Sequence, residues 1–177
     1  MVLWSSWNGL AWYGGYGEMV NFSRLSEIWS DWAPKAGLKG VSVSSNCEDC
    51  AIAFKADDYA AHIRGDRSHW AIDMVDDRGH RRNDVATFTS FDLVEKYLVW
   101  DWATLARSSL ASGPLGTDLY KLGYSEGIEV SELDKGNIEL CMDGECAILV
   151  VGDATIFSHI MHKSIDELLD IAQQGGL

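Results

Sequence analysis

With 27 acidic and 14 basic residues among its 177, the chain carries a formal net charge of −13. This balance disfavours nucleic acid and anionic membranes as partners, because both repel an acidic protein, and no apolar run approaches the roughly 20 residues of a membrane span. Four cysteines are too few for a disulfide-dense secreted scaffold, so we expect a cytoplasmic protein with an ordinary globular core.

Residues 1–18 fit neither a helical nor a strand pattern. Their five aromatic residues lie among glycines, and no charge occurs before Glu18. We expect a leader of uncertain order, and the alternative is an aromatic flap that packs on the domain. The glycine- and proline-containing segment 111–116 is the best internal boundary. We therefore expect an N-terminal α+β region over 19–112 and a C-terminal β-hairpin and helix region over 113–177, unless the two form one compact domain.

The first half of the chain predicts a helix, a group of strands and a loop. Leucine, isoleucine and tryptophan recur at helical spacing over residues 23–36, and Ser23 is the expected N-cap. Residues 41–76 alternate in short runs that are typical of an antiparallel meander. The charged segment 76–84 is expected to form a loop.

The clearest helical pattern covers residues 90–107. Its apolar residues fall near a 3.6-residue spacing, and Ser90 is a good N-cap. Asp92 and Arg107 lie at the ends where the helix dipole favours their charges. We expect this central amphipathic helix to pack together the strand regions that precede and follow it.

Three further strands are expected over residues 127–133, 137–142 and 145–151. Asp143 and Gly144 form a strong two-residue hairpin signal between the last two strands. This turn makes Cys141 and Cys146 cross-strand neighbours, which places them within reach of a disulfide if they are oxidised.

The chain closes with a helix. Ser164 and Glu167 have the spacing of a capping box, and apolar residues follow on one face. The predicted fold class is therefore α+β, with antiparallel strand meanders before and after a central amphipathic helix and a closing C-terminal helix.

Two cysteine pairs and five histidines are the candidates for chemistry. Cys47 and Cys50 have zinc-ribbon spacing, but a shared zinc site needs Cys141 and Cys146 to converge on them. No histidine pair matches a metal-binding motif, and neither a nucleophile elbow nor a phosphate-binding glycine loop is present. We therefore expect no catalytic residue, no metal ligand and no cofactor, and a binding protein rather than an enzyme. The alternatives are a small zinc-assisted hydrolase that uses the cysteine pairs and a protein-binding adaptor domain.

A resemblance to a known family begins at the central helix. The matching features are Trp70, Asp77-Arg78, Arg81, segment 94–98, Arg107, segment 122–124, the Asp143-Gly144 hairpin and Ser158-His159. In this order and spacing, over about residues 22–173, the chain resembles the immunity protein 61 family, the antitoxins of the tuberculosis necrotizing toxin. It departs from the family pattern at residues 102–104, which replace expected glycines, and at 111–114, which replace a Leu-Pro pair.

The resemblance implies a cytoplasmic immunity protein that does no chemistry itself. Such a protein binds, one to one, a secreted NAD(P)-degrading glycohydrolase toxin of mycobacteria or related actinobacteria, and it blocks the dinucleotide-binding cleft of that toxin. An acidic inhibitor suits a cleft built to hold pyrophosphate, because carboxylates engage the same hydrogen-bond donors.

Loops that flank the central helix are the expected toxin-binding surface. The candidate toxin-binding residues are Asp76, Asp77, Arg78, Asp118, Tyr120, Tyr124 and Glu126. Structural roles are expected for Trp70, Glu95, Tyr97, Leu98, Arg107 and His159. For Arg78 and Arg81, the alternative to toxin contact is an ion pair with a nearby acid.

Overall fold

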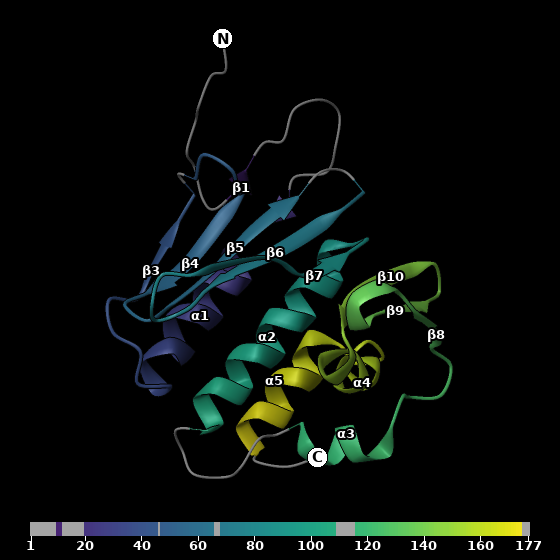
Figure 1. The fold of residues 1–177 in the computed structure, drawn as a ribbon. Coiled ribbons are helices and arrows are strands. Elements are labelled where there is room, and N and C mark those ends of the chain that lie inside the picture. The colour runs from purple at the N-terminus through teal and green to yellow at the C-terminus, as the bar shows by residue number, and fades with distance from the viewer. Residues whose placement is uncertain (1–9, 12–19, 46, 66–67, 109–115, 175–177) are drawn as a thin grey trace.

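The computed structural model describes residues 10–11, 20–45, 47–65, 68–108 and 116–174. The helices are α1 (Ser23–Lys35), α2 (Phe91–Ser108), α3 (Thr117–Leu122), α4 (Val151–Ile160) and α5 (Ile165–Gln174) (Figure 1). The strands are β1 (Leu10–Ala11), β2 (Val20–Asn21), β3 (Ser42–Ser44), β4 (Ile52–Ala56), β5 (Tyr59–Gly65), β6 (Trp70–Val75), β7 (Arg81–Phe88), β8 (Glu129–Glu132), β9 (Asn137–Met142) and β10 (Glu145–Val150). None of the helices in these ranges is long and apolar enough to cross a membrane.

One antiparallel sheet of eight strands runs through the molecule in the order β3-β4-β5-β6-β7-β10-β9-β8. The two strand regions join where β10 pairs with β7, with Ala147 opposite Phe88 and Leu149 opposite Ala86. The predicted α+β class, with antiparallel strands before and after a central helix and a closing helix, is confirmed. Helix α2 does not lie between two separate strand regions, because both belong to the sheet that it covers (Figure 1).

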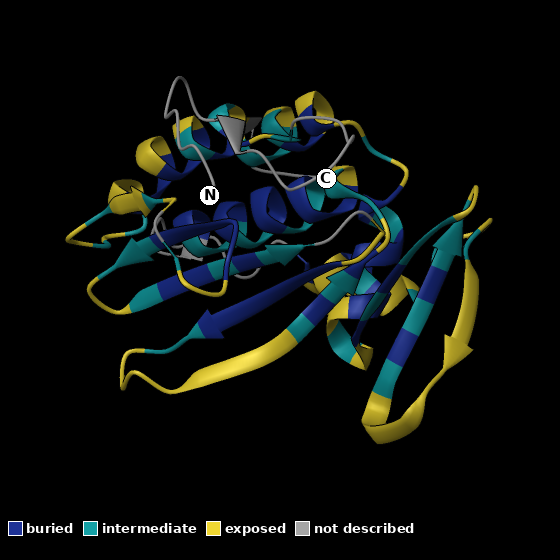
Figure 2. Ribbon diagram, turned by 90° about the horizontal axis from the view of Figure 1, so that it is seen from above, coloured by how far each residue is buried: buried dark blue, intermediate teal, exposed yellow. Residues whose placement is uncertain are grey.

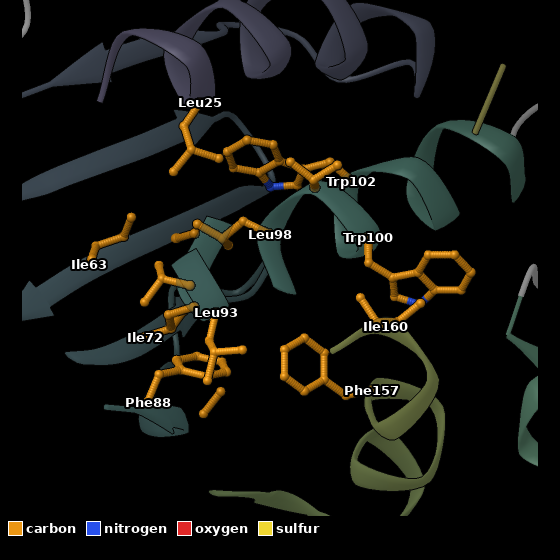
Figure 3. Packing of buried hydrophobic residues seen from close by; sticks show 14 of the residues in the cluster. Leu25, Ile63, Ile72, Phe88, Leu93, Leu98, Trp100, Trp102, Phe157 and Ile160 are labelled. Atoms are coloured by element: carbon orange, nitrogen blue, oxygen red, sulfur yellow. The ribbon is translucent and has the colours of Figure 1, made fainter. Parts of the chain in front are cut away.

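The hydrophobic core lies between the helices and one face of this sheet (Figure 2). Figure 3 shows Ile72 and Phe88 of the sheet beside Leu93 of α2. Further along α2, Trp102 is only 1% exposed, and its ring centroid lies 5.0 Å from those of both Trp29 and Phe54. The alternation of apolar residues along β6 and the 3.6-residue spacing in α2 therefore place their apolar side chains in one shared layer.

Two predicted helix starts are confirmed at the level of hydrogen bonds. The Leu93 amide donates to Ser90 Oγ at 3.4 Å, which caps α2. The Ser164 amide donates to Glu167 Oε2 at 2.7 Å and the Glu167 amide donates to Ser164 Oγ at 3.2 Å, which is a reciprocal capping box.

The predicted hairpin between β9 and β10 is also confirmed. Asp143 and Gly144 both have positive φ, 52° and 86°, as a type I′ turn requires. Cys141 lies directly opposite Cys146 with a Cα–Cα distance of 4.2 Å, and the two are joined by a disulfide.

Several local predictions are wrong. Phe22, not Ser23, is the N-cap of α1, and the Ser23 amide donates to Asn21 Oδ1 at 2.9 Å. Residues 81–84 are part of β7 rather than a loop, because Arg81 and Arg82 pair with Val75 and Met74 at the end of β6. Helices α3 and α4 were not expected; the apolar run of the last strand ends at Val150, and the chain turns directly into α4.

Candidate functional site

A pocket of about 660 Å³ opens on the helix-covered side of the sheet. It forms because β10 pairs only with residues 86–88 of β7, so the first half of β7 extends beyond its neighbour. The space beside it is bordered by α2 and by the first turn of α4. The lining residues are Asp58, Tyr59, Met74, Val75, Asp76, Asp77, Arg82, Asn83, Asp84, Val85, Tyr97, Asp101, Asn137, Val150 and Asp153. We call this the acidic pocket, because six of the described residues that line it are aspartates and only Arg82 is basic.

Asp101 of α2 is the partly buried carboxylate of the acidic pocket. Its Oδ2 accepts a hydrogen bond from the Tyr59 hydroxyl at 3.0 Å, and that hydroxyl accepts one from Trp102 Nε1 at 3.0 Å. Burial of the carboxyl raises the pKa of Asp101 to about 6, against the opposing effect of the Tyr59 hydrogen bond, and Asp153 raises it further. The Asp101 carboxylate therefore carries a negative charge that neighbouring groups of the protein compensate poorly.

Asp153 and Tyr97 add two further polar groups to the acidic pocket. Asp153 lies in the first turn of α4, where burial raises the pKa of its carboxyl and Arg82 opposes that effect. Burial also raises the pKa of the Tyr97 hydroxyl well above its usual range, with Asp101 and Asp153 contributing. Two carboxylates and a phenol that line one pocket form a site that favours a cation with hydrogen-bond donors.

The turn between β6 and β7 forms one rim of the acidic pocket. Asp76 Oδ1 accepts hydrogen bonds from the backbone amides of His80 at 2.9 Å and Arg78 at 3.0 Å. These bonds, with His80 first, lower the pKa of Asp76 and hold the turn in shape. Asp77 at the next position is exposed.

A buried ionic cluster on the opposite face holds the wall of the acidic pocket in place. Asp73 is fully buried, and its carboxylate accepts hydrogen bonds from Arg64 Nε at 2.9 Å and Arg81 Nη2 at 2.7 Å. The Asp84 amide also donates to it, at 2.8 Å, where β7 has a positive φ and the pairing with β6 shifts register. Although burial of the carboxyl acts in the opposite direction, these donors hold the pKa of Asp73 at about 2. Arg81 therefore makes the ion pair that was the structural alternative to toxin contact.

The predicted toxin-binding residues fall into two separate groups. Asp76 and Asp77 line the acidic pocket, and Arg78 lies beside them in the turn. The other four, Asp118, Tyr120, Tyr124 and Glu126, lie on α3 and the segment that follows it, and they do not line the pocket. That second surface exposes Tyr120 and Leu122.

Residues expected to be structural lie mostly inside the protein. Trp70, Leu98 and Arg107 are buried, and so is Glu95, whose carboxylate pairs with Arg24. His159 Nε2 lies 2.7 Å from the Gly123 carbonyl oxygen and thereby links α4 to the end of α3. Tyr97 differs from this group, because it lines the acidic pocket as well as packing against Phe88 and Phe157.

Three residues that line the pocket were not predicted from sequence patterns: Tyr59, Asp101 and Asp153. One signal was present for Asp101, which stands between Trp100 and Trp102 in a helical stretch that is otherwise apolar. An acid in such a position is either satisfied inside the protein or reserved for a ligand.

Comparison with known proteins identifies a family. Residues 32–174 match the family model described as immunity protein 61. The fold is similar to that of Rv3902c from M. tuberculosis, with a TM-score of 0.60 and 15% sequence identity over 82% of this chain and 86% of that chain. At this identity the structural likeness shows the fold alone. No curated protein matches the chain significantly.

Proposed function

The chain belongs to the immunity protein 61 family, and from this we propose that it is a cytoplasmic antitoxin that binds and inhibits a secreted NAD(P)-degrading glycohydrolase. The complex is one to one, and this chain contributes no chemistry of its own. The observation that supports the proposal most directly is the acidic pocket with its exposed carboxylate rim.

Inhibition in this proposal is steric and electrostatic. The β6–β7 turn enters the toxin cleft that holds the dinucleotide, and the carboxylates of Asp76 and Asp77 take the hydrogen-bond donors that otherwise bind pyrophosphate. A basic side chain of the toxin enters the acidic pocket in return and pairs with Asp153 and Asp101. Charge-assisted pairs that are desolvated at an interface contribute more than exposed ones, so the pocket supplies most of the specificity.

Measuring the NAD-cleaving rate of the cognate toxin tests the proposal. The purified antitoxin is expected to abolish cleavage at a one-to-one ratio. Asp153 is exposed in the free protein and becomes covered in the proposed complex. Removing one carboxylate from a buried interfacial pair costs about 2–5 kcal/mol, so Asp153→Asn should weaken binding by tenfold or more. Asp77→Asn on the exposed rim should have a smaller effect, chiefly on the association rate.

Asp118→Asn is the matched control, because it removes one exposed carboxylate from the α3 surface. It should leave inhibition unchanged. If Asp118→Asn weakens inhibition and Asp153→Asn does not, the toxin binds the α3 surface instead of the acidic pocket. If the wild-type protein leaves the NAD-cleaving rate unchanged, the proposed target is wrong.

A further inference from the structure

The segment between β3 and β4 brings two sulfur atoms close to a histidine of β5. Ligand atoms of Cys47, Cys50 and His62 all lie within 4.8 Å of one another. His62 lies in the middle of β5, opposite Ala53 of β4 and Asp73 of β6. The fold thus brings a Cys-x-x-Cys pair next to an imidazole of β5 that is distant in sequence.

One ring nitrogen of His62 lacks a hydrogen-bond partner among the described residues. This atom, Nδ1, is buried, and no described group hydrogen-bonds to it. Buried polar atoms without a partner are rare in folded proteins, because each one loses its hydrogen bonds to water without replacement. In the described part of the chain only one other side-chain atom, Nη1 of Arg107, shares this condition.

We propose that Cys47 Sγ, Cys50 Sγ and His62 Nδ1 form a binding site for Zn²⁺ or a similar thiophilic divalent ion when the cysteines are reduced. Two cysteines at this spacing with one histidine are a common zinc ligand set. Three protein ligands leave the fourth tetrahedral position to water or to a side chain of a partner. The ion would give the buried imidazole nitrogen the partner that it lacks.

The structure shows the oxidised form of this cysteine pair, a Cys47–Cys50 disulfide with a Cα–Cα distance of 5.0 Å. A thiol reductant converts it to the metal-binding form: two reductant thiols become a disulfide, and the cystine becomes two thiols. Metal binding then forms two sulfur–metal bonds and releases the two thiol protons. Reduction and metal binding are thus linked, and a reducing cytoplasm favours both.

The second cysteine pair does not take part. Cys141 and Cys146 face each other across the β9–β10 hairpin, whereas Cys47 and Cys50 lie beside β5. The sequence predicts no metal ligand, because a zinc site shared by the two pairs needs all four sulfurs to converge. The structure supplies His62 in place of the second pair. This proposal does not rest on the proposed antitoxin function, because the metal ligands are not among the residues that line the acidic pocket.

Cobalt and zinc titrations of the full chain, kept reduced with a phosphine, test the site. We expect one Co²⁺ per chain with thiolate-to-metal charge transfer and the visible bands of tetrahedral coordination, and displacement of that ion by Zn²⁺. The double variant Cys47→Ser/Cys50→Ser should lose the signal. His62→Gln should bind Zn²⁺ at least roughly tenfold more weakly, because it removes one of three protein ligands.

Cys141→Ser/Cys146→Ser is the matched control, since it removes the other cystine and should bind cobalt as the wild type does. Circular dichroism and urea denaturation report whether each variant is folded. Absence of charge transfer in the reduced wild type would overturn the proposal, as would unchanged zinc affinity in folded His62→Gln. Loss of the signal in a folded control variant would also overturn it, because the metal would then need the second pair.

Discussion

Asp101 is the residue at which stability and the proposed role in toxin binding are opposed. Its folded pKa of about 6 lies above the unfolded value of about 4, so the ionised carboxylate is less favourable in the fold than in the unfolded chain. This group therefore reduces stability progressively as the pH rises from about 4 to about 6, and the reduction is complete above that range. A carboxylate kept at such a cost inside a pocket is consistent with a role in binding.

Substitution of Asp101 by Asn should therefore stabilise the free protein. We expect the free energy of unfolding at pH 7 to increase by about 1 kcal/mol, after allowance for solvent screening, since the amide oxygen still accepts the Tyr59 hydrogen bond. At pH 4 the gain should vanish, because the aspartate is then neutral as well. Urea denaturation at the two pH values measures both quantities.

The same substitution should alter the pH dependence of toxin binding. A cation that enters the acidic pocket favours ionised Asp101, so wild-type affinity should fall as the pH decreases below about 6. Asp101→Asn should bind more weakly at pH 7 and lose much of this dependence. Unchanged affinity at every pH would mean that the pocket is not the binding site.

At the scale of the secondary structure elements, the Asp73 cluster connects β5, β6 and β7. One buried carboxylate accepts hydrogen bonds from arginines of two neighbouring strands and from the β7 backbone. Asp49 extends the cluster through its ion pair with Arg81 at 2.8 Å, which ties the segment after β3 to the sheet. The position of the pocket wall thus depends on an ionic contact on the other face.

Asp73→Asn should be strongly destabilising. Loss of the buried charge leaves Arg64 and Arg81 without their main partner, and we expect a cost of about 3 kcal/mol, since both arginines are partly exposed. Asp31→Asn, which breaks the exposed Asp31–Lys35 pair on α1, is the control and should cost less than about 1 kcal/mol. Equal effects of the two substitutions on urea denaturation would contradict the importance of the cluster.

The pH dependence of this contribution has the opposite sign to that of Asp101. Asp73 has a folded pKa of about 2, below the unfolded value of about 4, so its stabilisation is complete above pH 4. It should be lost as the pH falls from about 4 to about 2. In Asp73→Asn, acid unfolding should be correspondingly less steep over that interval.

At the scale of the whole molecule, the net charge of −13 should govern how fast the partner is found. A long-range field of one sign attracts a basic binding surface and raises the association rate, and salt screens that field. We expect the association rate with the toxin to fall about tenfold or more between low and physiological salt, with a much smaller change in the dissociation rate. Stopped-flow mixing at several salt concentrations measures this. An association rate that does not depend on salt would show that the acidic surface has no steering role.

Local signals in the sequence determined several helix ends, one hairpin and the central helix of this protein. Contacts between residues close in sequence form the helix starts at Ser90 and Ser164 and the Asp143-Gly144 hairpin. Such contacts can be predicted from the residue types and their spacing alone. The apolar periodicity over residues 90–107 likewise determined α2 and its buried face. Motif order along the chain was also sufficient to indicate the family.

Only the tertiary structure decided which residues that are far apart in sequence come into contact. The Tyr59 hydroxyl and Asp101 are 42 residues apart, and they meet because α2 lies across a sheet whose strand order no local pattern specifies. The join between β7 and β10 has the same origin, and it creates both the continuous sheet and the acidic pocket. His62 similarly reaches the Cys47–Cys50 pair only through strand pairing. Periodicity shows which face of an element is buried, but side-chain contacts between distant elements follow from how those faces pack.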